Sequence, residues 1–137
     1  MTRGTPVSAH LVWEEICCGC HRRGCADGCT GGALDPAVAD LFERIRASCS
    51  SYLGRDCPIR VSSGIRCPAH NRHVGGAAES AHLEGKALDL LCPEGLSLEI
   101  FWAVCGQEAG DGGFGKYHWG AHVDTRTHPP CRRWSAL

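Results

Sequence analysis

The sequence predicts an α+β fold, a single small domain in which helices flank a central antiparallel sheet. The chain has 137 residues, the length of one domain, and 43% of them are hydrophobic, which is enough for a core. Helical and strand patterns follow one another in the order α, β, β, α, β, β, which is typical of α+β proteins. Residues 1–33 are dense in Cys and Gly and are expected to be irregular. We therefore divide the chain into a Cys-rich N-terminal segment, 1–33, and a folded domain, 34–137.

Two helices are expected. Asp35 is placed to cap the first helix, Pro36 suits its first position, and Gly54 is a natural end. Its apolar residues recur at helical spacing and should form one buried stripe: Leu41, Phe42, Ile45, Cys49 and Leu53. Its charged residues should face solvent: Glu43, Arg44 and Arg46. Ser97 is expected to cap the second helix, whose apolar face would consist of Leu98, Phe101, Trp102 and Cys105.

Four strands are expected, at 58–64, 86–92, 114–117 and 119–124. The first alternates apolar and polar residues, and the second reads as a mostly buried strand that Pro93 closes. Residues 66–80 contain Pro68 and the pair Gly75-Gly76, so they are expected to form a loop.

Composition and charge exclude some classes of function. The formal net charge is −1 without a basic stripe, so no nucleic-acid partner is expected. No apolar run approaches the roughly 18–20 residues that span a membrane. Residues 1–10 lack the apolar stretch of a secretory signal, so we expect synthesis in a cytoplasm, or a mature form whose signal was removed. We also expect a monomer.

Eleven cysteines are an unusually high count, and an odd number cannot all pair within one chain. A structural zinc ion could be enclosed by four of them, Cys17, Cys20, Cys25 and Cys29, with Cys18 and His21 as competing ligands. Disulfides or reduced thiols are the alternatives for this cluster. Some of the remaining cysteines are expected to act as small core hydrophobes: Cys49, Cys57, Cys67, Cys92, Cys105 and Cys131.

The most informative residues are His82 and Asp89, with Gly85 between them and a strand beginning just before Asp89. His122, on a neighbouring strand, would complete a three-ligand site. Two imidazoles and one carboxylate form a known catalytic zinc set that leaves the fourth position to water, whose pKa the metal lowers toward about 7. The alternative for His82 and Asp89 by themselves is a solvated histidine and a strand-end aspartate.

Three motifs resemble one protein superfamily. Residues 80–89 match the Ser-x-His-x-x-Gly-x-Ala-x-Asp motif of zinc D-alanyl-D-alanine carboxypeptidases and dipeptidases. Residues 61–71 resemble the Ser-Gly-Tyr-Arg-Cys-Pro-x-His-Asn stretch of that superfamily. Residues 113–117 and 122–125 resemble its closing Gly-x-Gly-x-Tyr and His-x-Asp block, and Arg133-Trp134 matches its terminal Arg-Trp. The resemblance covers residues 35–134 in the right order.

This resemblance implies a fold shared with hedgehog signalling domains, and one catalytic zinc held by His82, Asp89 and His122. It also implies that Arg66 receives a carboxylate of the substrate peptide, which suits the planar fork of a guanidinium. Ser80 would either bind the substrate or brace its own loop. The segment 34–137 would then be the catalytic domain.

The general base is a separate question. Several relatives place a Glu, Asp or His just upstream of the last zinc ligand, where this chain has Trp119 and Gly120. Residues two apart on a strand share a face, so Asp124 should lie beside His122, either as the base or as a group that orients the imidazole. His118 is a further candidate for the base.

The leading functional hypothesis is a zinc metallopeptidase that acts on peptidoglycan peptides. Its target could be a D-Ala-D-Ala end, an L-Ala-D-Glu bond or a cross-link. Without a signal peptide, it would suit a phage lysin released at lysis, or a bacterial enzyme exported by another route. A hedgehog-type binding module that keeps zinc without turnover is the alternative. A nucleic-acid module built on the cysteines is a weaker hypothesis because the net charge is near zero.

Overall fold

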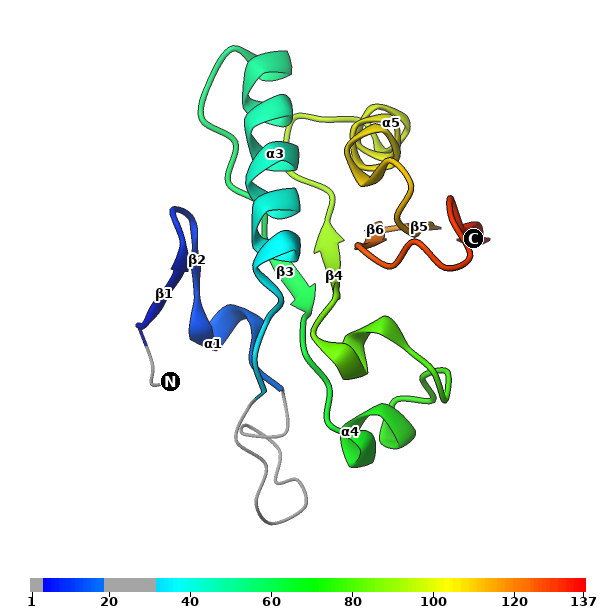
Figure 1. Cartoon of the computed structure of the whole chain (residues 1–137). Coiled ribbons are helices and arrows are strands. Elements are labelled where there is room, and N and C mark those ends of the chain that lie inside the picture. Colours follow the sequence, from blue (N-terminus) through cyan, green and yellow to red (C-terminus); the bar gives the residue numbers. More distant parts are fainter. Residues whose placement is uncertain (1–3, 19–31) are drawn as a thin grey trace.

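The computed structural model describes residues 4–18 and 32–137 (Figure 1). Its main sheet has five strands in the order β3-β4-β6-β5-β7. The strands are β3 (Val61–Ser63), β4 (Ala87–Leu91), β5 (Phe114–Tyr117), β6 (Gly120–Asp124) and β7 (Arg133–Ala136). Helix α3 (Pro36–Leu53) packs against α5 (Leu98–Ala109), and α5 packs against β5 and β6. The α+β prediction is confirmed.

Helix α3 has the predicted bounds. The amide of Ala37 donates to the side chain of Asp35 at 3.0 Å, and Gly54 ends the helix with φ of 68°, a value that glycine adopts without strain. The predicted stripe is buried, apart from Leu53, which is half-buried at the edge of the core. Glu43 and Arg46 are less exposed than expected. The carboxylate of Glu43 accepts a hydrogen bond from the hydroxyl of Ser8, and Arg46 forms an ion pair with Asp56.

The second helix is also confirmed, since the hydroxyl of Ser97 accepts from the amide of Ile100. Its buried positions are Phe101 and Cys105. The thiols of Cys49 and Cys57 lie in the same core, as expected for cysteines used as small hydrophobes.

The centre of the sheet is antiparallel and buried. Every residue of β6 is buried, as are all but the last of β4, and these two strands pair in regular register. One expectation needs correction at the edge, because β7 joins β5 in a parallel arrangement that the sequence analysis did not predict. The first strand is also shorter than predicted, since only Val61–Ser63 pairs with β4, and its register is irregular.

The expected loop at 66–80 contains a short helix, α4 (Pro68–His73). The sequence signal was present, because Cys67 caps this helix and Pro68 occupies its first position. The prediction of a continuous loop is therefore wrong over these six residues.

The N-terminal segment has regular structure between residues 6 and 16, where the sequence predicted none. Strands β1 (Pro6–Ser8) and β2 (Leu11–Val12) pair, and the short helix α1 (Trp13–Ile16) follows them. Leu11 and Ile16 are buried in the main core. The boundary at 33/34 stays a prediction. In the described ranges, no helix combines the length and the apolar character that a membrane crossing requires.

Candidate metal centre

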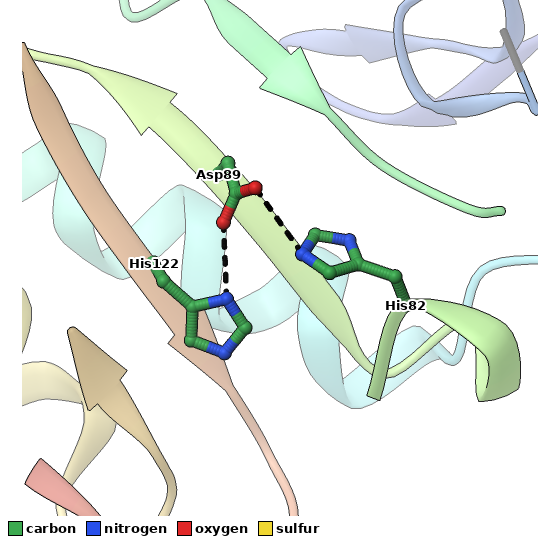
Figure 2. A group of neighbouring side chains, drawn as sticks. All are labelled: His82, Asp89 and His122. Carbon is green, nitrogen blue, oxygen red and sulfur yellow. Dashed lines mark hydrogen bonds and ion pairs between the residues drawn. The ribbon is translucent and has the colours of Figure 1, made fainter. Parts of the chain in front are cut away.

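Three side chains from three different elements meet beside the middle of strands β4 and β6 (Figure 2). His82 belongs to the 3-10 helix η1 (Ala81–Glu84), Asp89 to β4 and His122 to β6. Asp89 and His122 are direct partners in the antiparallel register, so the sheet itself holds these two side chains together. Within residues 4–18 and 32–137, this is the one group of three or more potential ligands whose ligand atoms all lie within 4.8 Å of one another.

The caps of the short helix η1 orient the side chain of His82 toward strands β4 and β6. The hydroxyl of Ser80 accepts from the amide of His82 at 3.2 Å and caps η1, and Gly85 closes it with φ of 68°. A Cβ on Gly85 would also meet the carbonyl oxygen of Ala33, so a glycine is required there for two reasons. Ser80 thus braces the loop that carries His82.

Each of the two imidazoles is oriented by a hydrogen bond at the ring nitrogen that faces away from Asp89. Nδ1 of His82 donates to the carbonyl of Gly64 at 2.6 Å, and Nε2 of His122 lies 2.7 Å from Oδ2 of Asp124. The opposite nitrogens face Asp89: His122 Nδ1 is 3.0 Å from Oδ1, and His82 Nε2 is 3.3 Å from Oδ2. Nε2 of His82 is buried and makes no hydrogen bond of good geometry within the described part of the chain. A metal ion that accepts this lone pair would satisfy it, so these residues fit a zinc site.

Charge at the cluster also suits a cation. Burial would raise the pKa of Asp89, but the neighbouring side chains of His122 and His82 outweigh it and hold the pKa well below its usual range. Burial would lower the pKa of His122, yet Asp124 and Asp89 raise it above its ordinary value. The cluster therefore stabilises one positive charge, carried by a proton or by a metal ion.

Asp124 lies beside His122, as its position two residues along the strand predicted. It is 1% exposed and its oxygens are fully used. Oδ1 accepts from the amide of Gly113 at 3.0 Å, the amide of Arg126 at 3.0 Å and the guanidinium of Arg132 at 2.8 Å. Oδ2 accepts a hydrogen bond from His122 Nε2. This geometry suits a group that orients the imidazole.

Arg66 stands at the edge of the cluster. Its Nη2 lies 3.4 Å from Oδ2 of Asp89, while its Nη1 and Nε donate to Asn71 and Ser63. Arg66 and Asp89 line a cavity of about 320 Å³, together with Glu15 of helix α1 and the indole of Trp119. A guanidinium at such a wall can meet a ligand carboxylate.

Two other predicted residues that the structure describes, His118 and Cys17, are not part of the cluster. His118 is exposed in the turn between β5 and β6, and within the described ranges it makes no hydrogen bond or ion pair. Of the four cysteines predicted to hold a structural zinc, the structure describes Cys17, whose thiol donates to the carbonyl of Glu14 at 3.7 Å. The other three, Cys20, Cys25 and Cys29, lie outside the described residues.

Sequence reasoning missed an aromatic wall. The ring of Tyr117 stacks on Trp119 with centroids 4.5 Å apart, and Trp134 lies 5.3 Å from Tyr117 and 5.2 Å from His122. Burial and the charge of Asp89 raise the pKa of Tyr117 to about 12, so its phenol keeps its proton at neutral pH. Tyr117 belongs to the Gly-x-Gly-x-Tyr motif and Trp134 to the terminal Arg-Trp motif, so these two motifs were the sequence signal for the aromatic residues.

A family model for peptidase M15 matches residues 9–124. The chain belongs to peptidase family M15. The family consists of zinc peptidases that resemble D-Ala-D-Ala carboxypeptidases, so the family resemblance is confirmed. The matched range contains the whole cluster and Arg66. No curated protein matches the chain significantly.

Proposed function

We propose that this chain is a zinc-dependent peptidase that hydrolyses the stem or cross-link peptides of peptidoglycan. The observation that carries the proposal is the pair of buried imidazole nitrogens, His82 Nε2 and His122 Nδ1, that converge on Asp89 in a chain of the M15 family. His82, Asp89 and His122 are the proposed zinc ligands. Three protein ligands leave one position of a tetrahedral zinc open, and zinc bound in this way polarises a carbonyl and activates a water molecule.

Arg66 is proposed to bind a carboxylate of the substrate. It combines a largely buried guanidinium with a place on the cavity wall, and the cavity also borders the metal ligand Asp89. A stem peptide ends in a free carboxylate, which Arg66 can hold by charge-assisted hydrogen bonds. Ser80 is assigned to bracing, because its hydroxyl already caps the loop of His82.

Asp124 is proposed to be a positioning residue. Its carboxylate holds a proton on His122 Nε2, so that Nδ1 is the nitrogen that would bind the metal once the imidazole is neutral. His118 stays a prediction for the general base. Glu15 deserves testing beside it, since among the described residues it supplies a second carboxylate to the cavity wall.

The proposal is tested with purified protein and purified peptidoglycan of several wall types, with and without a chelator. Mass spectrometry of the soluble fragments identifies the bond that is cut. We expect cleavage that stops on chelation and returns with zinc, and none with His122→Ala. A complete lack of metal-dependent cleavage on all wall types would reject the peptidoglycan assignment. Release by phage lysis would be tested by adding the protein to isolated cell walls and to intact cells, and by comparing its activity on the two.

A second candidate is a hedgehog-type binding module that contains zinc without turnover. The observation in its favour is that Trp119 and Gly120 stand where several relatives have a base, while Asp124 is fully hydrogen-bonded. This alternative expects full zinc occupancy, no hydrolysis, and zinc-dependent binding of the protein to cell-wall fragments. The same mass-spectrometric assay therefore separates the two functions.

A further inference from the structure

A second group of metal-binding side chains lies away from the His82–Asp89–His122 cluster. Cys67 and His70 belong to the first turn of α4, where Cys67 is the capping residue and His70 is the third residue of the helix. Cys18 follows helix α1 in the sequence and is completely buried. Two thiols and an imidazole from distant parts of the chain are thereby brought together.

The contacts between these three residues are direct. Sγ of Cys18 lies 3.4 Å from Nδ1 of His70 and accepts from the amide of Cys67 at 3.3 Å. Sγ of Cys67 accepts from the amide of His70 at 3.4 Å. The amide of Cys67 thus points a donor at the sulfur of Cys18, and a thiolate is the form of cysteine that binds metal.

The backbone holds the two segments together. The amide of Ile65 donates to the carbonyl of Ile16 at 2.8 Å. A Cβ on Gly64 would collide with that carbonyl oxygen, so the close approach of the segments depends on a glycine. Cys18 is therefore held beside Cys67 by chain geometry that does not depend on the thiols themselves.

We propose that Cys18, Cys67 and His70 bind a second ion, a divalent metal of the zinc class, in a structural site. Thiolate and imidazole are the ligands that zinc prefers in such sites, and three of them leave one tetrahedral position for a further ligand. The three ligand atoms do not all lie within 4.8 Å of one another, so at least one of the three side chains must rotate when the ion binds. Binding releases the thiol protons, since each thiol becomes a thiolate as its bond to the metal forms.

The site is coupled to the first metal centre. Residues 64–67 connect the two: the carbonyl of Gly64 accepts from His82 Nδ1, and the amide of Arg66 donates to the carbonyl of His82 at 3.1 Å. An ion at Cys67 would fix this segment, and with it the orientation of His82 and the position of Arg66. The second metal would act as a brace for the first site.

The experiment counts metal ions in the full chain, purified under reducing conditions without a chelator and saturated with zinc. We expect about two equivalents per chain. His122→Ala should lose one equivalent and His70→Ala the other, while the double variant should lose both. His73→Ala is the matched control, because His73 is exposed on the same helix, and it should keep both.

Cobalt substitution identifies the ligands without any assay of activity. Co²⁺ in the second site should give the near-ultraviolet absorption of thiolate bound to cobalt, and Cys67→Ser should weaken it while the exposed Cys131→Ser leaves it unchanged. If Cys67→Ser fails to fold, the spectrum of His70→Ala against His73→Ala serves instead. The proposal is overturned if the second equivalent of metal persists in His70→Ala, or if wild type binds only one equivalent. It is also overturned if Cys18 and Cys67 form a disulfide, which mass spectrometry would detect in protein kept non-reduced and metal-free before saturation.

Discussion

Nε2 of His122 lies 2.7 Å from Oδ2 of Asp124, on the edge of the imidazole opposite Asp89. A carboxylate can only accept here, so Nε2 carries a proton. When the imidazole is neutral, that proton leaves Nδ1 with a lone pair that can bind a metal ion in place of the Nδ1 hydrogen bond to Asp89. The other carboxylate oxygen of Asp124 is occupied by two amides and the guanidinium of Arg132. This relationship distinguishes positioning from proton transfer, and it leads to the first prediction.

Asp124→Asn should weaken zinc binding by about 10–100-fold, and added zinc should restore activity. The amide keeps the shape of the carboxylate but no longer holds the imidazole in one tautomer. A zinc titration of activity measures the effect. If Asp124 were instead the base, the variant would keep its zinc and lose activity by roughly 10²–10⁴-fold at any zinc concentration.

His122→Ala should abolish zinc binding at the His82–Asp89–His122 cluster, because a histidine and a carboxylate by themselves hold the ion poorly. Elemental analysis of protein purified without chelator gives the result. His118→Ala is the control, since His118 is exposed in the adjacent turn and is not a proposed ligand. Full occupancy of the cluster in His122→Ala would contradict the assignment.

Arg66→Ala should lower kcat/KM by about 10–100-fold, the worth of one lost hydrogen bond to a charged group. Arg66→Lys should recover part of this loss, since it keeps the charge but not the fork. Arg72→Ala is the matched control, because Arg72 is exposed on the neighbouring helix α4. Zinc content is measured for each variant, and an unchanged kcat/KM in zinc-loaded Arg66→Ala would exclude the proposed role.

The metal-free protein should be most stable between about pH 4 and about pH 6.5. Burial would raise the pKa of Asp124, but the hydrogen bond of His122 and the charges around it lower the pKa, and that of Asp89 is lowered too. Their stabilisation is present above the ordinary aspartate pKa and is lost as the pH falls through the lowered values. The pKa of His122 is raised, so its stabilisation is present below the ordinary histidine pKa and is lost as the pH rises.

Urea unfolding of metal-free protein across this range measures the free energy of unfolding directly. Asp124→Asn should show a shallower fall of that free energy on the acidic side. If the free energy of unfolding of the variant fell as steeply at acidic pH as that of wild type, Asp124 would not contribute to this pH dependence.

Gly64→Ala should destabilise the fold by about 1–3 kcal/mol, because a Cβ there would collide with the carbonyl of Ile16. Denaturant unfolding measures the loss, with Ser62→Ala on the exposed side of β3 as the control. Equal stability of Gly64→Ala and wild type would mean that the contact between residues 16 and 64 is loose. The N-terminal segment would then contribute little to the position of the Gly64 carbonyl that orients His82.

Local signals in the sequence predicted both long helices well. Asp35, Pro36 and Gly54 set the ends of α3 through hydrogen bonds and dihedral angles that involve only neighbouring residues. The same type of signal was present at Cys67 and Pro68 but was overlooked, so α4 was missed. The parallel strand β7 had no local signal, because its pairing with β5 depends on how the chain returns to the sheet edge.

The sequence by itself determined the set of residues at the candidate centre, since His82, Asp89 and His122 occur in motifs of recognisable spacing. The tertiary structure decided how each one is used. It selected the nitrogen that each imidazole turns inward, buried Asp124 among four donors, and placed Cys18 beside His70. These contacts join residues far apart in the chain, and their geometry arises only when the sheet, η1 and α1 pack together. Spacing along the sequence carries no information about that packing.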